Sequence, residues 1–163
     1  MAISKKFVKK KSVYKTRRYW YHLSTTLVYG ELLLLKPWNN EKGFNRDHSE
    51  PNIERICVAP SIAQCLTALP YSIGDKFTIY RTKSKVKAEK PTGVFDATVT
   101  NEGWITKPTV FIKIGTLLLR DLGDWNDIPD ERASMGKIHE SRYNLNRWKK
   151  MNLWKYVKRV KTA

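Results

Sequence analysis

RICVAPSIAQCLTALPYSIGDKFTIYRT, residues 55–82, contains the clearest succession of secondary-structure signals in this chain of 163 residues. The apolar run at residues 56–59 has the length and the flanking residues of a buried strand. Ser61 and Gln64 then follow with the Ser-x-x-Gln spacing of a capping box, in which a hydroxyl accepts a hydrogen bond from a free N–H group of a starting helix. This pattern predicts that a helix begins at Ile62.

The predicted helix has one apolar face and a clear end. Its apolar residues are three and four positions apart, at Ile62, Cys65, Leu66 and Leu69. Pro70 and Gly74 end the helix, and alternating large residues at 77–80 predict a second strand. The result is a strand–helix–strand unit in which the unpaired N–H groups of the helix lie beside residues 59–62.

The chain carries a large excess of positive charge. Lys and Arg number 31 against 15 Asp and Glu, a net charge of +16. This excess is greater than solubility requires, so we expect a polyanionic partner, DNA or RNA first. The alternatives are an acidic protein partner or a charge that only keeps the chain in solution.

The two cysteines, Cys57 and Cys65, fit neither a metal site nor a disulfide framework in number and spacing, so no metal site is predicted. Buried thiols in a reducing compartment are the simpler interpretation. The charged N-terminus lacks an apolar segment of signal-peptide length, and the apolar run at residues 32–35 is too short to span a bilayer. These features predict a cytoplasmic protein, in the host cytoplasm if the protein is viral.

Charge and pattern divide the chain into four parts. These are a basic arm at residues 1–18, a core at 19–120, an acidic loop or helix at 121–143 and a basic helix at 144–163. Further strands are predicted at residues 19–24, 32–35, 94–100 and 110–119. Residues 101–104 are predicted to form a turn.

The two basic ends are the predicted nucleic-acid contacts. In the arm, like charges repel one another unless phosphates neutralise them, and the predicted C-terminal helix could lay a Trp ring against a base or sugar. The same helix could instead lie on an anionic membrane or cover the sheet with its apolar side. The candidate residues are Lys9, Lys10, Lys11, Arg17, Arg18, Lys150, Trp154, Lys155 and Lys158.

A series of short motifs resembles the ADP-ribosyltransferase fold, closest in layout to the small bacterial rifamycin ADP-ribosyltransferases. The motifs are Tyr21-His22-Leu23-Ser24, Gly30-x-Leu-Leu and the segments 56–69, 77–80 and 108–115. The resemblance covers about residues 19–119 and leaves both basic ends unexplained. It implies an α/β (α+β) fold in one domain, with a split and mostly antiparallel sheet.

The resemblance also implies roles for individual residues. His22 would hold the ribose hydroxyls of NAD, with Ser24 where the family often has Thr, and Ser61 lies beside the same nucleotide site. Cys57 falls where the family has an aromatic residue that stacks on nicotinamide, and a thiol cannot stack. Glu102 or Asp96 lies in the region of the family's catalytic acid, so His22 and Glu102 are the candidate catalytic residues.

These observations lead to one preferred function and two alternatives. The preferred function is a nucleic-acid-binding or polyanion-binding protein on an ADP-ribosyltransferase-like scaffold that has lost catalysis. One alternative is an active NAD-dependent ADP-ribosyltransferase that modifies nucleic acid or protein. The other is a non-catalytic interaction protein of viral type, which binds a nucleotide signal or blocks a host complex.

Overall fold

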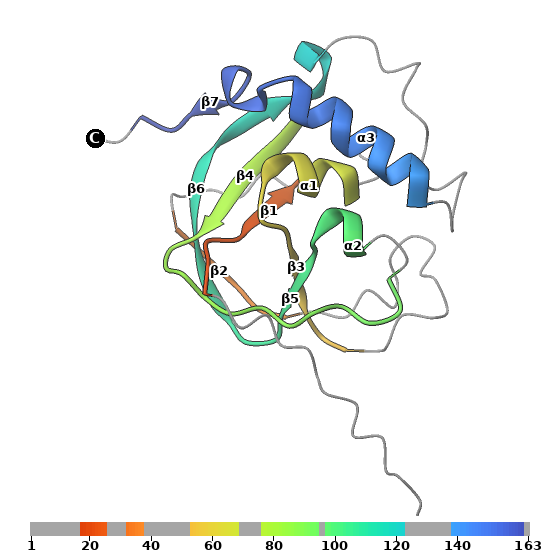
Figure 1. The fold of residues 1–163 in the computed structure, drawn as a ribbon. Coiled ribbons are helices and arrows are strands. Elements are labelled where there is room, and N and C mark those ends of the chain that lie inside the picture. The colour runs from red at the N-terminus through yellow and green to blue at the C-terminus, as the bar shows by residue number, and fades with distance from the viewer. Residues whose placement is uncertain are drawn as a thin grey trace, which may run out of the picture.

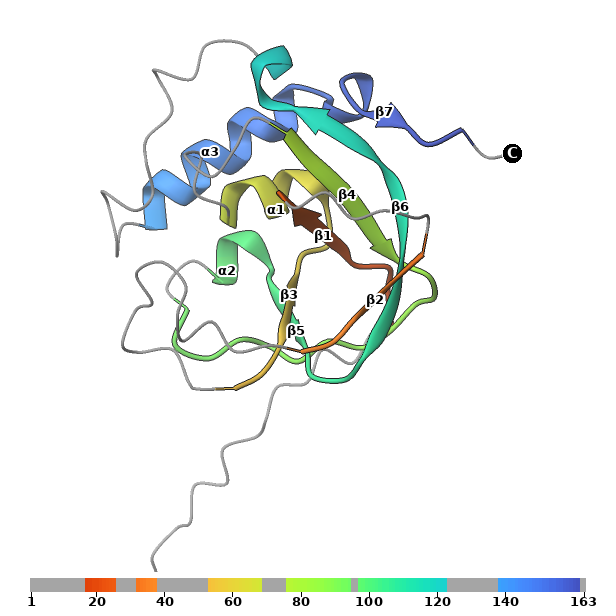
Figure 2. The same cartoon turned by 180° about the vertical axis from the view of Figure 1, so that it is seen from behind.

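The computed structural model describes residues 17–25, 32–37, 53–68, 76–94, 97–122 and 138–161, with side chains described except at 138–141. The fold is mixed α/β and rich in antiparallel sheet (Figures 1 and 2). The described strands are β1 (Tyr21–Ser24), β2 (Leu32–Leu35), β3 (Ile56–Val58), β4 (Lys76–Thr82), β5 (Gly103–Ile105), β6 (Thr109–Leu118) and β7 (Lys158–Arg159). The described helices are α1 (Ile62–Ala68), α2 (Ala97–Thr100) and α3 (Ile138–Lys150), with 3-10 turns η2 (Leu119–Leu122) and η3 (Leu153–Lys155).

The strands form two antiparallel sheets. The larger has the order β1-β4-β6-β2, with β7 paired to β6, and the smaller pairs β3 with β5. Tyr21 and Ala59 join the sheets through two backbone hydrogen bonds of 2.9 and 3.0 Å. In Figures 1 and 2, α1 and α3 cover one end of the large sheet, and β3 and β5 lie beside its other end.

The strand–helix–strand unit predicted for residues 55–82 is confirmed, with a capped start to its helix. The Gln64 N–H donates to Ser61 Oγ at 3.2 Å, and the Ser61 hydroxyl donates to Gln64 Oε1 at 2.9 Å. The helix α1 ends at Ala68, and the predicted end at Pro70 and Gly74 lies outside the described residues. Its flanking strands, β3 and β4, belong to different sheets.

Two apolar clusters fill the space around the large sheet. The first joins one face of the sheet to α1, α3 and η3, and includes Leu66, Phe77 and Trp148. The second joins the opposite face to β3 and β5 around Trp20, which is fully buried. The indole Nε1–H of Trp20 donates to the Val86 carbonyl at 3.0 Å, so the polar edge of this ring is satisfied in the core.

The prediction of a strand at residues 94–100 is wrong, because Ala97–Thr100 form the short helix α2. An alternating pattern buries one side of a strand, whereas Ala97, Val99 and Thr100 are all buried where α2 packs near α1 and α3. Asn101, with φ of 49°, ends the helix in the left-handed region that Asn tolerates. The turn predicted at 101–104 is also shorter, since Gly103 and Trp104 both lie within β5.

The prediction of one helix over residues 144–163 is wrong as well. The helix α3 begins earlier and ends at Lys150, and Asn152 (φ 33°) redirects the chain into η3 and then β7. Leu153 and Val157 enter the same apolar cluster as the helix residue Leu145, so the apolar pattern continues across the change of conformation. β7 pairs with β6 opposite Gly115, where a Cβ atom would lie 2.5 Å from the Lys158 carbonyl oxygen.

None of the helices in the described ranges combines the length and apolarity needed to cross a membrane.

Candidate functional site

His22 lies on β1 next to β3 of the small sheet and is half-buried. Its Nδ1 is 3.0 Å from the Cys57 carbonyl oxygen, and its ring meets Phe111 edge to face with centroids 6.1 Å apart. A carbonyl only accepts, so Nδ1 carries the proton of the neutral ring. Burial lowers the pKa of His22, and the bond to Cys57 opposes this in part. His22 is therefore a neutral residue that links β1 to β3.

Glu102 directly precedes β5 and lies close to Cys57 of β3. Its Oε1 accepts a hydrogen bond of 2.9 Å from Trp104 Nε1–H, and Trp104 pairs with Cys57 across the small sheet. Burial raises the pKa of the Cys57 thiol above its usual range, and the Glu102 carboxylate raises it further. The structure thus brings together three positions from distant parts of the sequence: His22, Cys57 and Glu102.

The remaining residues of the predicted nucleotide site have structural partners or lie outside the described residues. The Ser61 hydroxyl is engaged in the cap of α1, and Ser24 lies half-buried on β1 opposite Thr78. Asp96 is outside the described residues. Within the described part of the chain, no group of His, Cys, Asp and Glu side chains could hold a metal ion.

The prediction of a buried thiol is confirmed for Cys65, whereas Cys57 is half-buried. Cys65 Sγ donates to the Tyr21 carbonyl at 3.4 Å, and burial raises its pKa to about 12. A thiol must lose its proton to attack an electrophile, so neither Cys57 nor Cys65 is activated at neutral pH.

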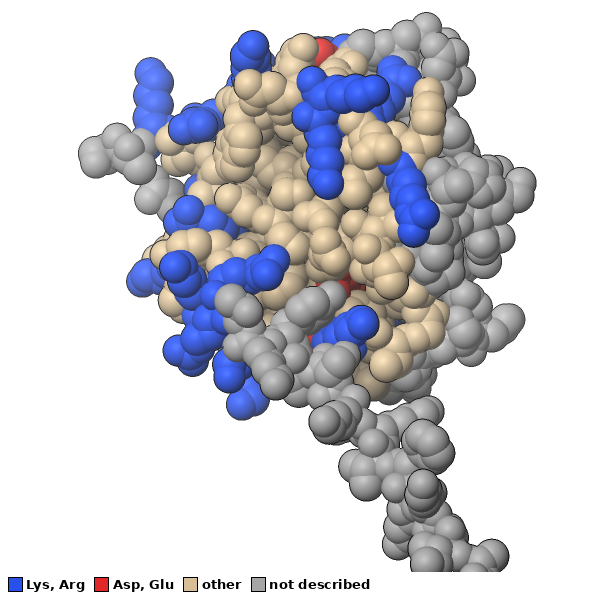
Figure 3. Space-filling view, viewed as in Figure 1, with Lys and Arg blue, Asp and Glu red and all other residues tan. Residues whose placement is uncertain are grey.

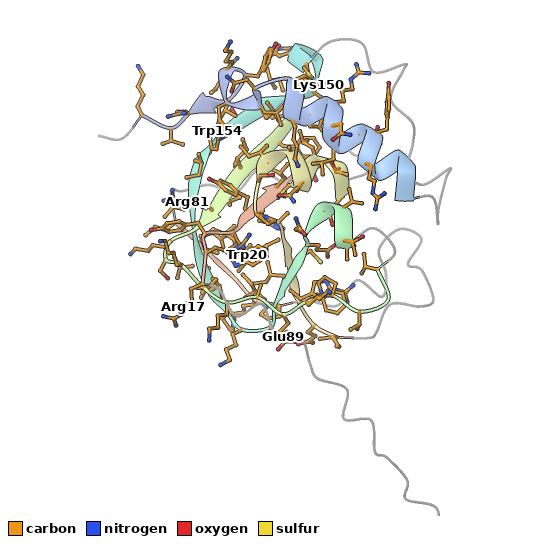
Figure 4. The ribbon with its side chains drawn as sticks, in the orientation of Figure 1. Arg17, Trp20, Arg81, Glu89, Lys150 and Trp154 are labelled. Atoms are coloured by element: carbon orange, nitrogen blue, oxygen red, sulfur yellow. The ribbon has the colours of Figure 1, made fainter. Side chains whose placement is uncertain are left out.

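A second candidate site lies at one end of the large sheet, where the chain enters β1 and leaves β4. Arg18 forms a backbone bridge with Val86, through hydrogen bonds of 3.2 and 3.0 Å. This bridge places the exposed Arg17 and Arg18 beside the exposed lysines that follow β4: Lys83, Lys85 and Lys87. Figure 3 shows Lys and Arg side chains gathered at this lower-left part of the surface, where Figure 4 labels Arg17 and Arg81.

Tyr19 and Arg81 form the centre of this basic surface. The Arg81 Cζ lies 4.4 Å from the centroid of the Tyr19 ring, and the Lys85 Nζ lies 5.8 Å from it. These two cations contact the Tyr19 ring. The residue is also 38% exposed, so the ring still meets solvent. The buried Arg81 Nε has no hydrogen-bond partner among the described residues. The positive charge of the guanidinium beside an exposed ring is complementary to an anionic group that carries an aromatic base.

Trp154 is a second exposed aromatic residue on this side of the molecule. It is 38% exposed, meets Tyr21 edge to face at 6.1 Å and has the Arg159 guanidinium 5.3 Å from its ring. Figure 4 places Trp154 at the same margin of the molecule as Arg81 and Arg17. The other candidate cations of this region are exposed: Lys150, Lys155 and Lys158.

The structure describes some of the residues that were predicted to contact nucleic acid. Lys9, Lys10 and Lys11 lie outside the described residues. Sequence reasoning missed Tyr19 and Arg81 as site residues. The available signal was a Tyr just before β1 and an Arg within β4, two predicted strands whose alternation determines the face of each side chain. Their contact depends on the register of β1 against β4, which no local pattern gives.

Comparison with protein-family models, curated proteins and solved structures found no match for this chain.

Proposed function

We propose that this chain is a nucleic-acid-binding protein that holds phosphates on the basic face of its large sheet. The observation that carries the proposal is the contact of Arg81 with the exposed Tyr19 ring, bordered by Arg17, Arg18 and Lys85. Cations in this number beside an exposed aromatic ring match both parts of a nucleotide, since the phosphate takes the charge and the base takes the ring.

The net charge of the whole chain supports the same function. At +16 the chain attracts polyanions over distances of about a Debye length, which is about 10 Å at 0.1 M salt. The described cations near Tyr19 belong to segments far apart in the sequence, residues 17–18 and 81–87, that the Arg18–Val86 bridge brings together. A folded chain is therefore needed for binding, beyond charge alone.

The scaffold is proposed to be of ADP-ribosyltransferase type without transferase activity. Three features support the loss of catalysis. Cys57 offers no ring for nicotinamide, His22 is committed to a backbone carbonyl, and the Glu102 carboxylate accepts the Trp104 indole N–H. These residues fit NAD poorly as a reacting cofactor, because nicotinamide has no ring to stack on and the Glu102 oxygen that holds Trp104 is not free to stabilise the charge that develops on the sugar.

Fluorescence anisotropy with labelled oligonucleotides tests the binding function. The double variant Arg81→Gln, Lys85→Gln removes two charges beside Tyr19, and Arg120→Gln, Arg142→Gln removes two exposed charges from η2 and α3. We expect the first pair alone to weaken binding and to reduce the salt slope by about 0.7 to 0.9 per lost phosphate contact. Failure of the wild type to bind at low salt, or equal losses in both variants, would refute the proposal.

An active NAD-dependent ADP-ribosyltransferase is the second candidate. It is favoured by the meeting of His22 and Glu102 around Cys57, as the family resemblance implies. Incubation with labelled NAD and with nucleic acid or protein acceptors separates the two candidates. Transfer of label that is lost in Glu102→Gln and His22→Asn would support the enzyme, and an absence of NAD turnover would support the binding protein.

A further inference from the structure

One face of the large sheet presents a continuous row of side chains across four strands. Residues directly opposite one another in neighbouring strands share a face, and the register aligns Tyr21, Arg81, Ile112 and Leu32. Leu34 and Val110 form the adjacent pair on β2 and β6. We call these six residues the open sheet face.

The aliphatic part of this face meets solvent. Leu32 and Leu34 are 58% and 56% exposed, whereas Leu33, which points to the opposite face, packs against the cluster around Trp20. A strand with one wet face normally alternates apolar and polar residues, and β2 instead has four leucines. Contiguous exposed apolar side chains of this kind mark a binding surface.

The cations of the face favour an occupant that carries negative charge. Arg81 lies in the middle of the row, with its guanidinium over Tyr19 and its buried Nε without a hydrogen-bond partner among the described residues. Lys83 lies next to Val110, because its backbone N–H donates to the Val110 carbonyl at 2.9 Å. An apolar protein segment would leave these cations without anionic partners. A nucleic-acid duplex would satisfy them with phosphates, but its bases are stacked inside and would leave the leucines uncovered.

We propose that the open sheet face binds single-stranded nucleic acid. Unpaired bases lie against Tyr19, Tyr21 and the aliphatic side chains of β2 and β6, and phosphates lie against Arg81 and the neighbouring lysines. This inference rests on the proposed nucleic-acid-binding function and specifies the form of nucleic acid that the site takes. Single-stranded DNA and RNA share the required chemistry.

The test compares single-stranded DNA, single-stranded RNA and duplex DNA of one sequence at one salt concentration. Tyr19→Leu removes the ring, Tyr19→Phe retains it, and Leu34→Ser removes apolar area at an exposed position. Tyr143→Leu on α3, where Tyr143 is 53% exposed, is the matched aromatic control. We expect Tyr19→Leu and Leu34→Ser to weaken single-strand binding, the former at least about fivefold, while Tyr19→Phe and Tyr143→Leu bind like the wild type.

Several results would overturn the inference. Equal or tighter binding of duplex would leave nucleic-acid binding intact and refute the single-strand assignment, whereas a lack of binding to any nucleic acid would refute both. A concentration-dependent dimer that Leu34→Ser abolishes would show that a second copy of the chain covers the face. Circular dichroism and thermal unfolding identify a variant that fails to fold. If Tyr19→Leu fails to fold, Leu34→Ser still tests the inference, because Leu34 is exposed and its substitution leaves the core intact.

Discussion

At the scale of single residues, burial sets the protonation of His22 and of the two thiols. His22 stays neutral because a charged ring would lose its hydration there, and both thiols stay protonated for the same reason. His22 links β1 to β3 and Cys65 links α1 to β1, each through a hydrogen bond to a backbone carbonyl. The sequence identified His22 and Glu102 through a family resemblance, but only the pairing of β3 with β5 brings Glu102 beside Cys57.

Thiol labelling checks the state of the cysteines. Because the pKa of Cys65 is about 12 and that of Cys57 is also raised, we expect a maleimide or disulfide reagent to modify the native protein at pH 8 far more slowly than the denatured protein. The denatured chain provides the control for full reactivity at both positions. Rapid modification of one thiol in the native state would show that this thiol is activated.

Unfolding at several pH values checks His22. The pKa in the folded protein lies below the unfolded value of about 6.5, so the unfolded state takes up the proton first and stability falls as the pH drops below that value. We expect the free energy of unfolding of the wild type to decrease between pH 7.5 and pH 5 more than that of His22→Asn. Asn retains a donor for the Cys57 carbonyl, and the lost ring contact should cost about 1 kcal/mol at pH 7.5. An identical pH dependence in both proteins would contradict the lowered pKa.

At the scale of elements, local signals predicted the segments whose burial follows a regular period. The capping box and apolar spacing gave α1, and continuous or alternating apolar runs gave β3, β4 and β6. They failed for α2 and β7, where tertiary contacts decide the conformation. Val99 is buried on a short helix near α3, and Lys158 pairs with β6 because Gly115 leaves space for its backbone.

Substitution of Gly115 tests how the C-terminal segment is attached. In Gly115→Val the side chain would meet the Lys158 carbonyl oxygen and Val157 Cγ1, so β7 must separate from β6. We expect a loss of about 1–3 kcal/mol in stability and faster tryptic cleavage after Lys155, Lys158 and Arg159. Thr116→Val, at the neighbouring half-buried position of β6, is the control and should leave both quantities close to those of the wild type. Unchanged cleavage in Gly115→Val would exclude this attachment.

At the scale of the whole molecule, the described part of each basic end is joined to the rest of the fold by backbone pairing. Arg18 pairs with Val86, and Arg159 on β7 pairs with Gly115 of β6. Composition predicted a polyanionic partner, and the sequence assigned the expected contacts to the two ends only. The surface that the fold assembles also includes Tyr19, Arg81 and Lys83, whose proximity follows from strand register and could not be predicted from charge.

Ultraviolet cross-linking of the full chain to a bromouracil-substituted single strand, followed by mass spectrometry of the peptides, tests the central claim most directly. We predict cross-links at Tyr19, Tyr21 or Trp154, the aromatic residues beside Arg81 and Arg159. The exposed Tyr143 on α3 serves as the internal control and should remain free of label. Cross-links confined to α3 or to other surfaces away from the large sheet would contradict the account.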